Sequence, residues 1–311
     1  MNAAIVAGNA ASGPFFITLA PGCTYTLSSP FAGNNGLTRV TGNITISGLG
    51  TSVVRSTTST SDFRVMEVDS SGSLTLNSIT VAGGKASLGG GIESSGALTL
   101  NGSTVRDNSA SLGGGLAVLG GRLALSGSAV RHNTATNFGG GIATGGPSVT
   151  LVLRASGIGN NTATGFGGGI GIGAPDNTVS MSGGSLSRNT ATSGGGFFGG
   201  ANDTETDLTG VTVKDNRATS SIGGGGILNE GPLKMIGGAL RNNKSVAGPG
   251  GGLRNVQMPA TLTGVTVTGN SATDGGGVFV DSGPVTAVGS FFASNNPNNC
   301  APAGAVAGCS H

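Results

Sequence analysis

Two carboxylates in matching segments are the first residues that could do chemistry. Asp69 and Glu93 each begin a segment that continues Ser-Ser-Gly, so the two segments align residue for residue. Stacked on neighbouring repeats, they would be spaced like the acid and nucleophile of a retaining glycosidase, which lie about 5 to 5.5 Å apart. Two carboxylates also suit a calcium ion. Two solvated surface acids explain the same pattern equally well.

The densest group of ionisable residues is formed by Arg106, Asp107, Arg131 and His132. In the register of the repeat described below, Asp107 and His132 share one column, and the two arginines share the column beside it. A lyase would use such a base beside cations that stabilise an enolate. Ion pairs between neighbouring repeats on an exposed face are the alternative, and these contribute only about 0 to 1 kcal/mol each.

A third group consists of three acids that alternate along one segment, namely Asp203, Glu205 and Asp207. Alternate residues of a strand point to the same side, so the carboxylates would face one way, with Lys234 stacked over Asp207 from the next repeat. Oxygen ligands of this kind suit Ca²⁺. A solvated strand face is the simpler interpretation, and no other cofactor is predicted.

An internal repeat must position all of these residues. Blocks of three glycines, each followed by an apolar residue, recur every 24 to 30 residues and end at Gly91, Gly115, Gly141, Gly169, Gly196, Gly226, Gly252 and Gly277. Triple glycines in every unit argue against helical repeats. An apolar-x-x-Asn unit recurs with the same period, and its asparagines are Asn108, Asn133, Asn161, Asn189, Asn216, Asn243, Asn270 and Asn295.

Between each glycine block and the next asparagine lies an alternating strand. Aligning these strands predicts one buried column at Ile46, Leu76, Leu100, Leu125, Leu153, Met181, Leu208, Met235, Leu262 and Ala287. Two residues later stands a column of small residues typical of a tight corner, at Gly48, Ser78, Gly102, Gly127, Ala155, Gly183, Gly210, Gly237, Gly264 and Gly289.

These ten rungs, with three short strands per repeat, predict an all-β, right-handed parallel β-helix of about ten coils. Parallel strands about 4.8 Å apart would give an axis of roughly 43 Å. We expect a single domain over residues 1–311, with an N-terminal cap and entry strand at 1–40, coils at 41–295 and a C-terminal cap at 296–311.

The asparagine column predicts a ladder of stacked amides, with each asparagine in the left-handed conformation that this residue tolerates. The first equivalent position is Gly84, which has no amide and so marks the end of the ladder. Phe138 and Phe166 precede their glycine blocks and predict an aromatic stack inside the coil. Phe198 and Phe279 are out of phase with the buried column, which leaves an exposed aromatic patch as an alternative to packing there.

Composition excludes several classes of protein. Charged residues make up 9% of the chain, whereas soluble proteins carry about 25%. The formal net charge of +2, with one Tyr and no Trp, gives no basis for nucleic-acid binding. No stretch reaches the roughly 18 apolar residues of a membrane-spanning helix, so no transmembrane segment is predicted.

The cysteines bear on localisation. Cys300 and Cys309 bracket a short Pro/Gly-rich loop, and Cys23 lies far away. We expect a disulfide between the last two, because it would staple a terminal loop, with Cys23 free. Since disulfides persist in oxidising compartments, a secreted or cell-surface location is expected, with any export signal outside this sequence. Three reduced thiols in a cytosolic protein are the alternative.

The glycine and asparagine units resemble a known family of repeats. Gly-Gly-Gly-Ile paired with apolar-x-x-Asn resembles the repeats of chlamydial polymorphic outer-membrane proteins and related bacterial β-helix surface proteins, over about residues 80–295. Those repeats read Gly-Gly-Ala-Ile and Phe-x-x-Asn, and only residues 292–295 match the latter literally. Residues 17–27 and 299–309 resemble the ends of secreted actinobacterial-type β-helix repeat proteins. The resemblance implies export and an adhesive or surface role.

The sequence favours a noncatalytic extracellular or cell-surface scaffold that displays its outer faces, with a polysaccharide or cell-surface molecule as its ligand. A polysaccharide-active lyase or glycoside hydrolase is the first alternative. A filament-forming or ice-binding protein is the second, although an outward column that begins Thr45, Thr75, Thr99 breaks at Ala124. The oligomeric state is not predicted.

Overall fold

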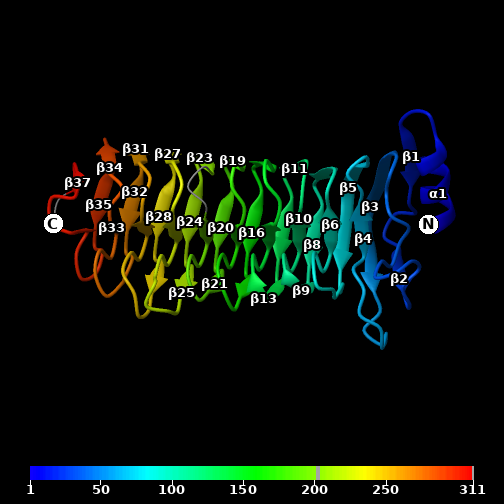
Figure 1. Ribbon diagram of the computed structural model, residues 1–311, viewed down its shortest axis with the longest axis horizontal. Coiled ribbons are helices and arrows are strands. Elements are labelled where there is room, and N and C mark those ends of the chain that lie inside the picture. The colour runs from blue at the N-terminus through cyan, green and yellow to red at the C-terminus, as the bar shows by residue number, and fades with distance from the viewer. Residues whose placement is uncertain (201–203, 310–311) are drawn as a thin grey trace.

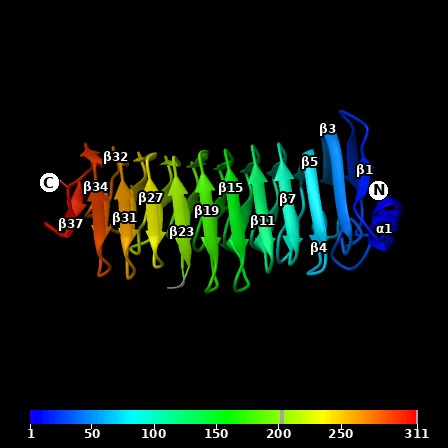
Figure 2. The ribbon, with the colours of Figure 1, turned by 90° about the horizontal axis from the view of Figure 1, so that it is seen from above.

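The computed structural model describes residues 1–200 and 204–309 and forms a parallel β-solenoid of about ten turns. The two chain ends lie at opposite ends of a rod whose strands run across its long axis (Figures 1 and 2). The predicted all-β parallel fold is therefore confirmed.

The largest sheet contains 21 strands arranged in two columns that meet at a corner. The first column consists of β1 (Phe15–Thr18), β3 (Asn43–Arg55), β5 (Ser73–Ala82), β7 (Ala97–Asn101), β11 (Arg122–Ser126), β15 (Thr150–Arg154), β19 (Thr178–Ser182), β23 (Glu205–Thr209), β27 (Leu233–Ile236), β31 (Ala260–Thr263), β34 (Val285–Val288) and β37 (Val306–Ala307). The second consists of β2 (Thr24–Leu27), β8 (Thr104–Arg106), β12 (Ala129–Arg131), β16 (Gly157–Gly159), β20 (Ser185–Ser187), β24 (Thr212–Lys214), β28 (Ala239–Arg241), β32 (Thr266–Thr268) and β35 (Phe291–Ala293). The long strands β3 and β5 pass through the corner and join the columns.

Two further sheets complete each turn. The ten-stranded sheet consists of β4 (Met66–Val68), β6 (Ile92–Ser94), β10 (Leu116–Val118), β14 (Ile142–Thr144), β18 (Ile170–Ile172), β22 (Phe197–Gly199), β26 (Ile227–Asn229), β30 (Leu253–Asn255), β33 (Val278–Val280) and β36 (Cys300–Ala301). The six-stranded sheet consists of β9 (Ser109–Leu112), β13 (Thr134–Phe138), β17 (Thr162–Ala163), β21 (Thr190–Ala191), β25 (Arg217–Ala218) and β29 (Lys244–Ser245). A central coil therefore contains four short strands. The prediction of three strands per repeat was wrong, because the corner divides the large sheet into two columns of strands.

The helix α1 (Asn2–Ala10) covers the N-terminal end of the rod, where it contacts β1 and β3. Ile5 is buried against the core, and the Asn9 side chain accepts hydrogen bonds from the backbone of Thr41 and Gly42. Within the described residues, no helix combines the length and hydropathy required to cross a bilayer.

The strand register reproduces the predicted buried column. Ile46 pairs with Leu76, and the same ladder continues coil by coil to Leu262 and Ala287. Nine of the ten predicted corner residues have positive φ, for example 54° at Gly102. The exception is Gly48, where β3 bulges and the left-handed residue is Gly50.

The asparagines form one continuous hydrogen-bonded ladder. In each of the seven steps from Asn108 to Asn295, the Nδ2 donates to the Oδ1 of the next coil's asparagine at 2.9 to 3.1 Å. The backbone N–H of the same residue donates to that Oδ1 as well. At the first step the backbone of Gly84 takes this place and donates to the Oδ1 of Asn108.

The predicted left-handed conformation of these asparagines is wrong by one residue. Positive φ falls on the residue before each one, for example 57° at Asp107, 56° at His132 and 54° at Arg188. The preceding residue makes the turn, so that the asparagine side chain can point into the rod. Left-handed φ is uncommon for a residue such as Arg188, so the ladder holds it in that conformation.

The glycine blocks let neighbouring coils approach each other beside the ladder. A Cβ at Gly140 would lie 2.4 Å from the carbonyl oxygen of Gly168, and one at Gly141 would lie 3.0 Å from the Nδ2 of Asn161. Side chains at these positions would collide with backbone and with the ladder itself. The two repeated sequence units are therefore parts of one packing arrangement.

Cys300 and Cys309 form a disulfide at the C-terminal end of the rod, and Cys23 is a free, exposed thiol. Cys300 lies in β36 and is buried in the core, and Cys309 packs against that core. The disulfide thus ties the last described residues to the final coil.

Replacing Asn189 with Ala should lower the free energy of unfolding by roughly 1 to 3 kcal/mol, because the backbone N–H and the amide of Asn161 would lose their acceptor inside the rod. Asn295→Ala should lower the free energy of unfolding by less, because Asn295 is 8% exposed and water can replace part of its hydrogen bonding. Denaturant titration of both variants measures this difference. Equal and negligible losses would contradict a stabilising ladder.

Candidate functional site

The carboxylate that stacks on Glu93 is Glu67, and the predicted pairing of Asp69 with Glu93 is wrong. In the register of β4 and β6, Glu67 lies opposite Glu93 and Val68 opposite Ser94. Asp69 instead precedes a turn closed by a hydrogen bond from the Gly72 N–H to the Asp69 carbonyl. This turn adds two residues that the next coil lacks, which shifts the register between the two segments.

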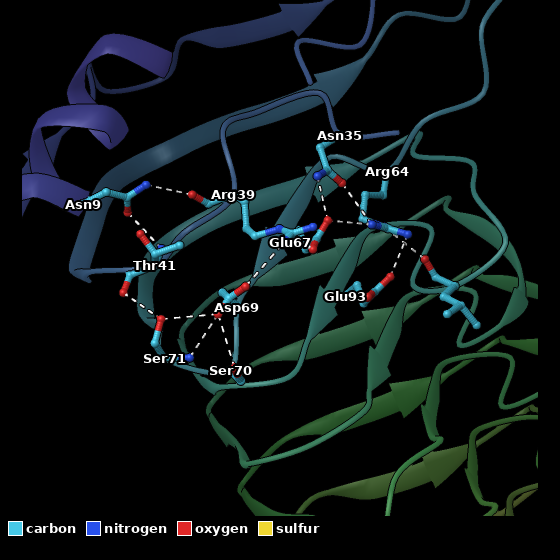
Figure 3. Close-up of polar contacts among 11 residues, drawn as sticks. Asn9, Asn35, Arg39, Thr41, Arg64, Glu67, Asp69, Ser70, Ser71 and Glu93 are labelled. Carbon is cyan, nitrogen blue, oxygen red and sulfur yellow. Dashed lines mark hydrogen bonds and ion pairs between the residues drawn. The ribbon is translucent and has the colours of Figure 1, made fainter. Parts of the chain in front are cut away.

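Arg64 joins the two stacked carboxylates. Its guanidinium lies 2.8 Å from Glu67 Oε2 and 2.6 Å from Glu93 Oε2, and its Nε donates to the carbonyl of Leu88 (Figure 3). The exposed fractions of the three side chains are only 9%, 11% and 13%. A buried carboxylate requires such a partner.

A second layer of this ionic cluster comes from the segment 28–42. Arg39 lies 2.6 Å from Glu67 Oε1, and Asn35 donates to Glu67 Oε2 at 2.6 Å. Asn35 also accepts a hydrogen bond from Arg64 at 3.0 Å. Both oxygens of Glu67 are therefore occupied, and the cluster fastens the segment 28–42 onto the edge of the ten-stranded sheet.

The carboxyl groups of this region differ in acidity. Burial raises the pKa of Glu93 above its usual value of 4.5, against the opposing effect of Arg64, and the neighbouring Glu67 raises it further. The pKa of Asp69 is lowered, chiefly by a hydrogen bond from the backbone N–H of Ser71. Glu93 thus takes up a proton more readily than Asp69 does.

The hollow beside the cluster does not expose a catalytic pair. A cavity of about 430 Å³ is lined by Asn34, Asn35, Arg39, Arg64 and Glu67, together with Ala32 and Gly33. Glu93 does not line this hollow, and the Glu67 oxygens are held by arginine and amide groups. The geometry supports a structural clamp better than an acid and nucleophile pair.

The second predicted group lies in the expected columns but pairs differently. Arg106 and Arg131 are opposite each other on β8 and β12. Arg106 forms an ion pair with Asp107 of its own coil, and Arg131 contacts the His132 ring at 3.4 Å. The expected ion pairs between coils are not formed among the described residues, and no acid faces His132 to orient it as a base.

Of the third group, Asp203 lies outside the described residues. Glu205 and Asp207 are exposed on the same side of β23, and Lys234 lies opposite Asp207 as predicted. Together with Pro232 and other residues they line an open hollow of about 440 Å³. Within residues 1–200 and 204–309, no three His, Cys, Asp or Glu side chains come together in an arrangement that could hold a metal ion.

The aromatic predictions are partly wrong. Phe198 is 8% exposed, with ring centroids 4.8 Å from Phe166 and 5.7 Å from Phe138. Phe197 points into the core, so its neighbour Phe198 packs on the outer side of the ten-stranded sheet. The aromatic cluster therefore covers this sheet from outside, and Phe279 is only half-buried.

Sequence reasoning missed Arg64, Glu67, Asn35 and Arg39. A usable signal existed, because Met66-Glu67-Val68 and Ile92-Glu93-Ser94 share an alternation of buried and outward residues. Aligning on the apolar residues rather than on Ser-Ser-Gly would have stacked Glu67 on Glu93. Nothing local in the sequence places Asn35 and Arg39 over β4, because their segment is irregular.

Glu93→Gln tests the raised pKa. Because the folded protein holds a proton on Glu93 more tightly than the unfolded chain does, the stability contributed by this group should be greatest below pH 4.5 and fall as the pH rises through the raised pKa. The unfolding free energy of the wild type minus that of Glu93→Gln should therefore decrease with rising pH. Thermal or denaturant unfolding at several pH values measures it, with the exposed Glu205→Gln as control. A difference that grows with pH would show that Arg64 outweighs burial.

Comparison with known proteins identifies no relative of this chain. No protein-family model, curated protein or solved structure matches the chain. A parallel β-solenoid of about ten turns is what the structure shows. The narrower likeness to polymorphic outer-membrane or actinobacterial-type repeats stays a prediction.

Proposed function

We propose that this protein is a noncatalytic extracellular or cell-surface scaffold that displays its outer faces for binding polysaccharides or other surface molecules. One observation carries the proposal: Glu67 and Glu93 lie opposite each other on neighbouring strands, and Arg64 binds both. Catalysis on a glycan needs carboxylates free to reach the substrate. Here they fasten one segment of the rod to another.

The outer faces support the same proposal. Outward side chains of the first column are short and mostly polar, such as Thr75, Thr99 and Ser180, and they lie in register along the rod. Parallel strands set these positions about 4.8 Å apart. A rigid surface of this kind suits the display of many weak contacts along an extended ligand.

Incubation of the purified protein with pectic, alginate and glycosaminoglycan polymers, with and without calcium, tests this proposal. We expect binding to at least one polymer and no release of unsaturated uronates or reducing ends. Turnover that disappears in Glu93→Gln or His132→Ala, but survives in the matched control Glu205→Gln, would show that the protein is an enzyme.

A further inference from the structure

The cations of this chain are concentrated on one edge of the rod. Seven of its 15 lysine and arginine residues lie within two residues of a ladder asparagine, where the only acids in the sequence are Asp107 and Asp215. We call these seven residues the basic ridge: Arg106, Arg131, Arg188, Lys214, Arg217, Arg241 and Lys244.

The strand register brings like charges together on this ridge. Lys214 lies opposite Arg241 on β24 and β28, and Arg217 lies opposite Lys244 on β25 and β29. Neighbouring parallel strands are about 4.8 Å apart, so two coils present four cations in a two-by-two array. Arg217, Arg241 and Lys244 are exposed, and Lys214 is partly exposed.

No ion pair neutralises the array within the part of the chain that the structure describes. Among residues 1–200 and 204–309, none of these four cations forms an ion pair, although Asp215 lies on the same corner. Like charges directly opposite each other destabilise a sheet. By contrast, Arg39, Arg64 and Arg254 all pair with carboxylates. A ligand with repeated negative charges would relieve the repulsion on the ridge.

We propose that the basic ridge binds an acidic polysaccharide, whose carboxylate or sulfate groups lie along the array formed by Lys214, Arg217, Arg241 and Lys244. This inference rests on the proposed scaffold function and identifies its ligand class. Arginine forks bind such oxyanions with two parallel hydrogen bonds. The ridge follows the rod axis across successive coils, which suits a linear polymer.

A nucleic acid fits the ridge less well. Proteins that bind single strands stack the bases on aromatic side chains. The strands that carry the densest part of the ridge, β24, β25, β28 and β29, contain no aromatic residue. A charged, sequence-independent contact with sugar acids or sulfates needs no such platform.

Binding of the full chain to heparin and to polygalacturonate, with uncharged dextran for comparison, tests the ridge. The double variant Arg217→Gln/Lys244→Gln should bind the acidic polymers at least about tenfold more weakly, the loss expected for one charged hydrogen bond. The control Arg122→Gln/Arg154→Gln removes the same charge from exposed positions on the first column, where neither arginine lies opposite a charged residue. It should stay within about twofold of the wild type.

Several results would overturn the assignment. Equal losses in both double variants, with unchanged melting temperatures, would show attraction to net charge alone. Failure of the wild type to bind any acidic polymer, or preference for anionic phospholipid vesicles or single-stranded DNA, would also overturn it. Binding of dextran alone without turnover would contradict the ridge and leave the scaffold function standing, whereas turnover would contradict the scaffold whatever the ridge variants do.

Discussion

The buried asparagine ladder is the interaction on which the rest of this structure depends. A primary amide has two donors and two acceptor sites, and in a central member such as Asn189 all four are used. Such full satisfaction is possible only when equivalent residues of successive coils lie in register. A slip of one residue would leave several polar groups unpaired inside the rod, at a cost of about 1 to 3 kcal/mol each. The ladder therefore fixes the register, and the register fixes which side chains meet on the surface.

Functional differences along the rod must then come from its outward positions. At the N-terminal end, Arg64 and Glu67 hold the irregular segment 28–42 against the sheet. Further along, the corner beside the ladder carries a stacked array, Lys214, Arg217, Arg241 and Lys244, that forms no ion pair among the described residues. The same spacing produces a clamp where opposite charges meet and a proposed binding ridge where like charges meet.

The sequence was sufficient to predict the fold because its strongest signals report on the interior. The apolar column from Ile46 to Ala287 and the asparagine ladder both follow from strict repetition, which close packing of the coils enforces. Surface chemistry was harder to predict. The matching flanking residues align Asp69 with Glu93, but the turn after β4 is two residues longer than its counterpart in the next coil, so Glu67 takes that place. The partners of Glu67 come from the segment 28–42, which is non-repetitive, so no periodic pattern could locate them.

The backbone conformations at the two corners of each coil differ in how far the sequence predicts them. Small residues marked the corner at Gly102 and its equivalents correctly, since a side chain there has a steric cost. At the ladder corner the left-handed residue is Asp, Asn or Gly in five of eight coils, but it is His132, Arg188 or Ser294 in the other three, so residue type gave only a partial signal. Only the inward direction required of the asparagine explains why the preceding residue takes that conformation.

Native-state hydrogen exchange of the ladder amides tests most directly the claim that the asparagines fix the register. The backbone N–H groups of Asn161 and Asn189 donate to the side chains of Asn189 and Asn216 and should exchange at the rate of global unfolding. Protection should decline toward Gly84 and Asn270, the donors at the two ends of the ladder. Fast exchange at Asn161 and Asn189, while the neighbouring strand amides remain protected, would contradict this account.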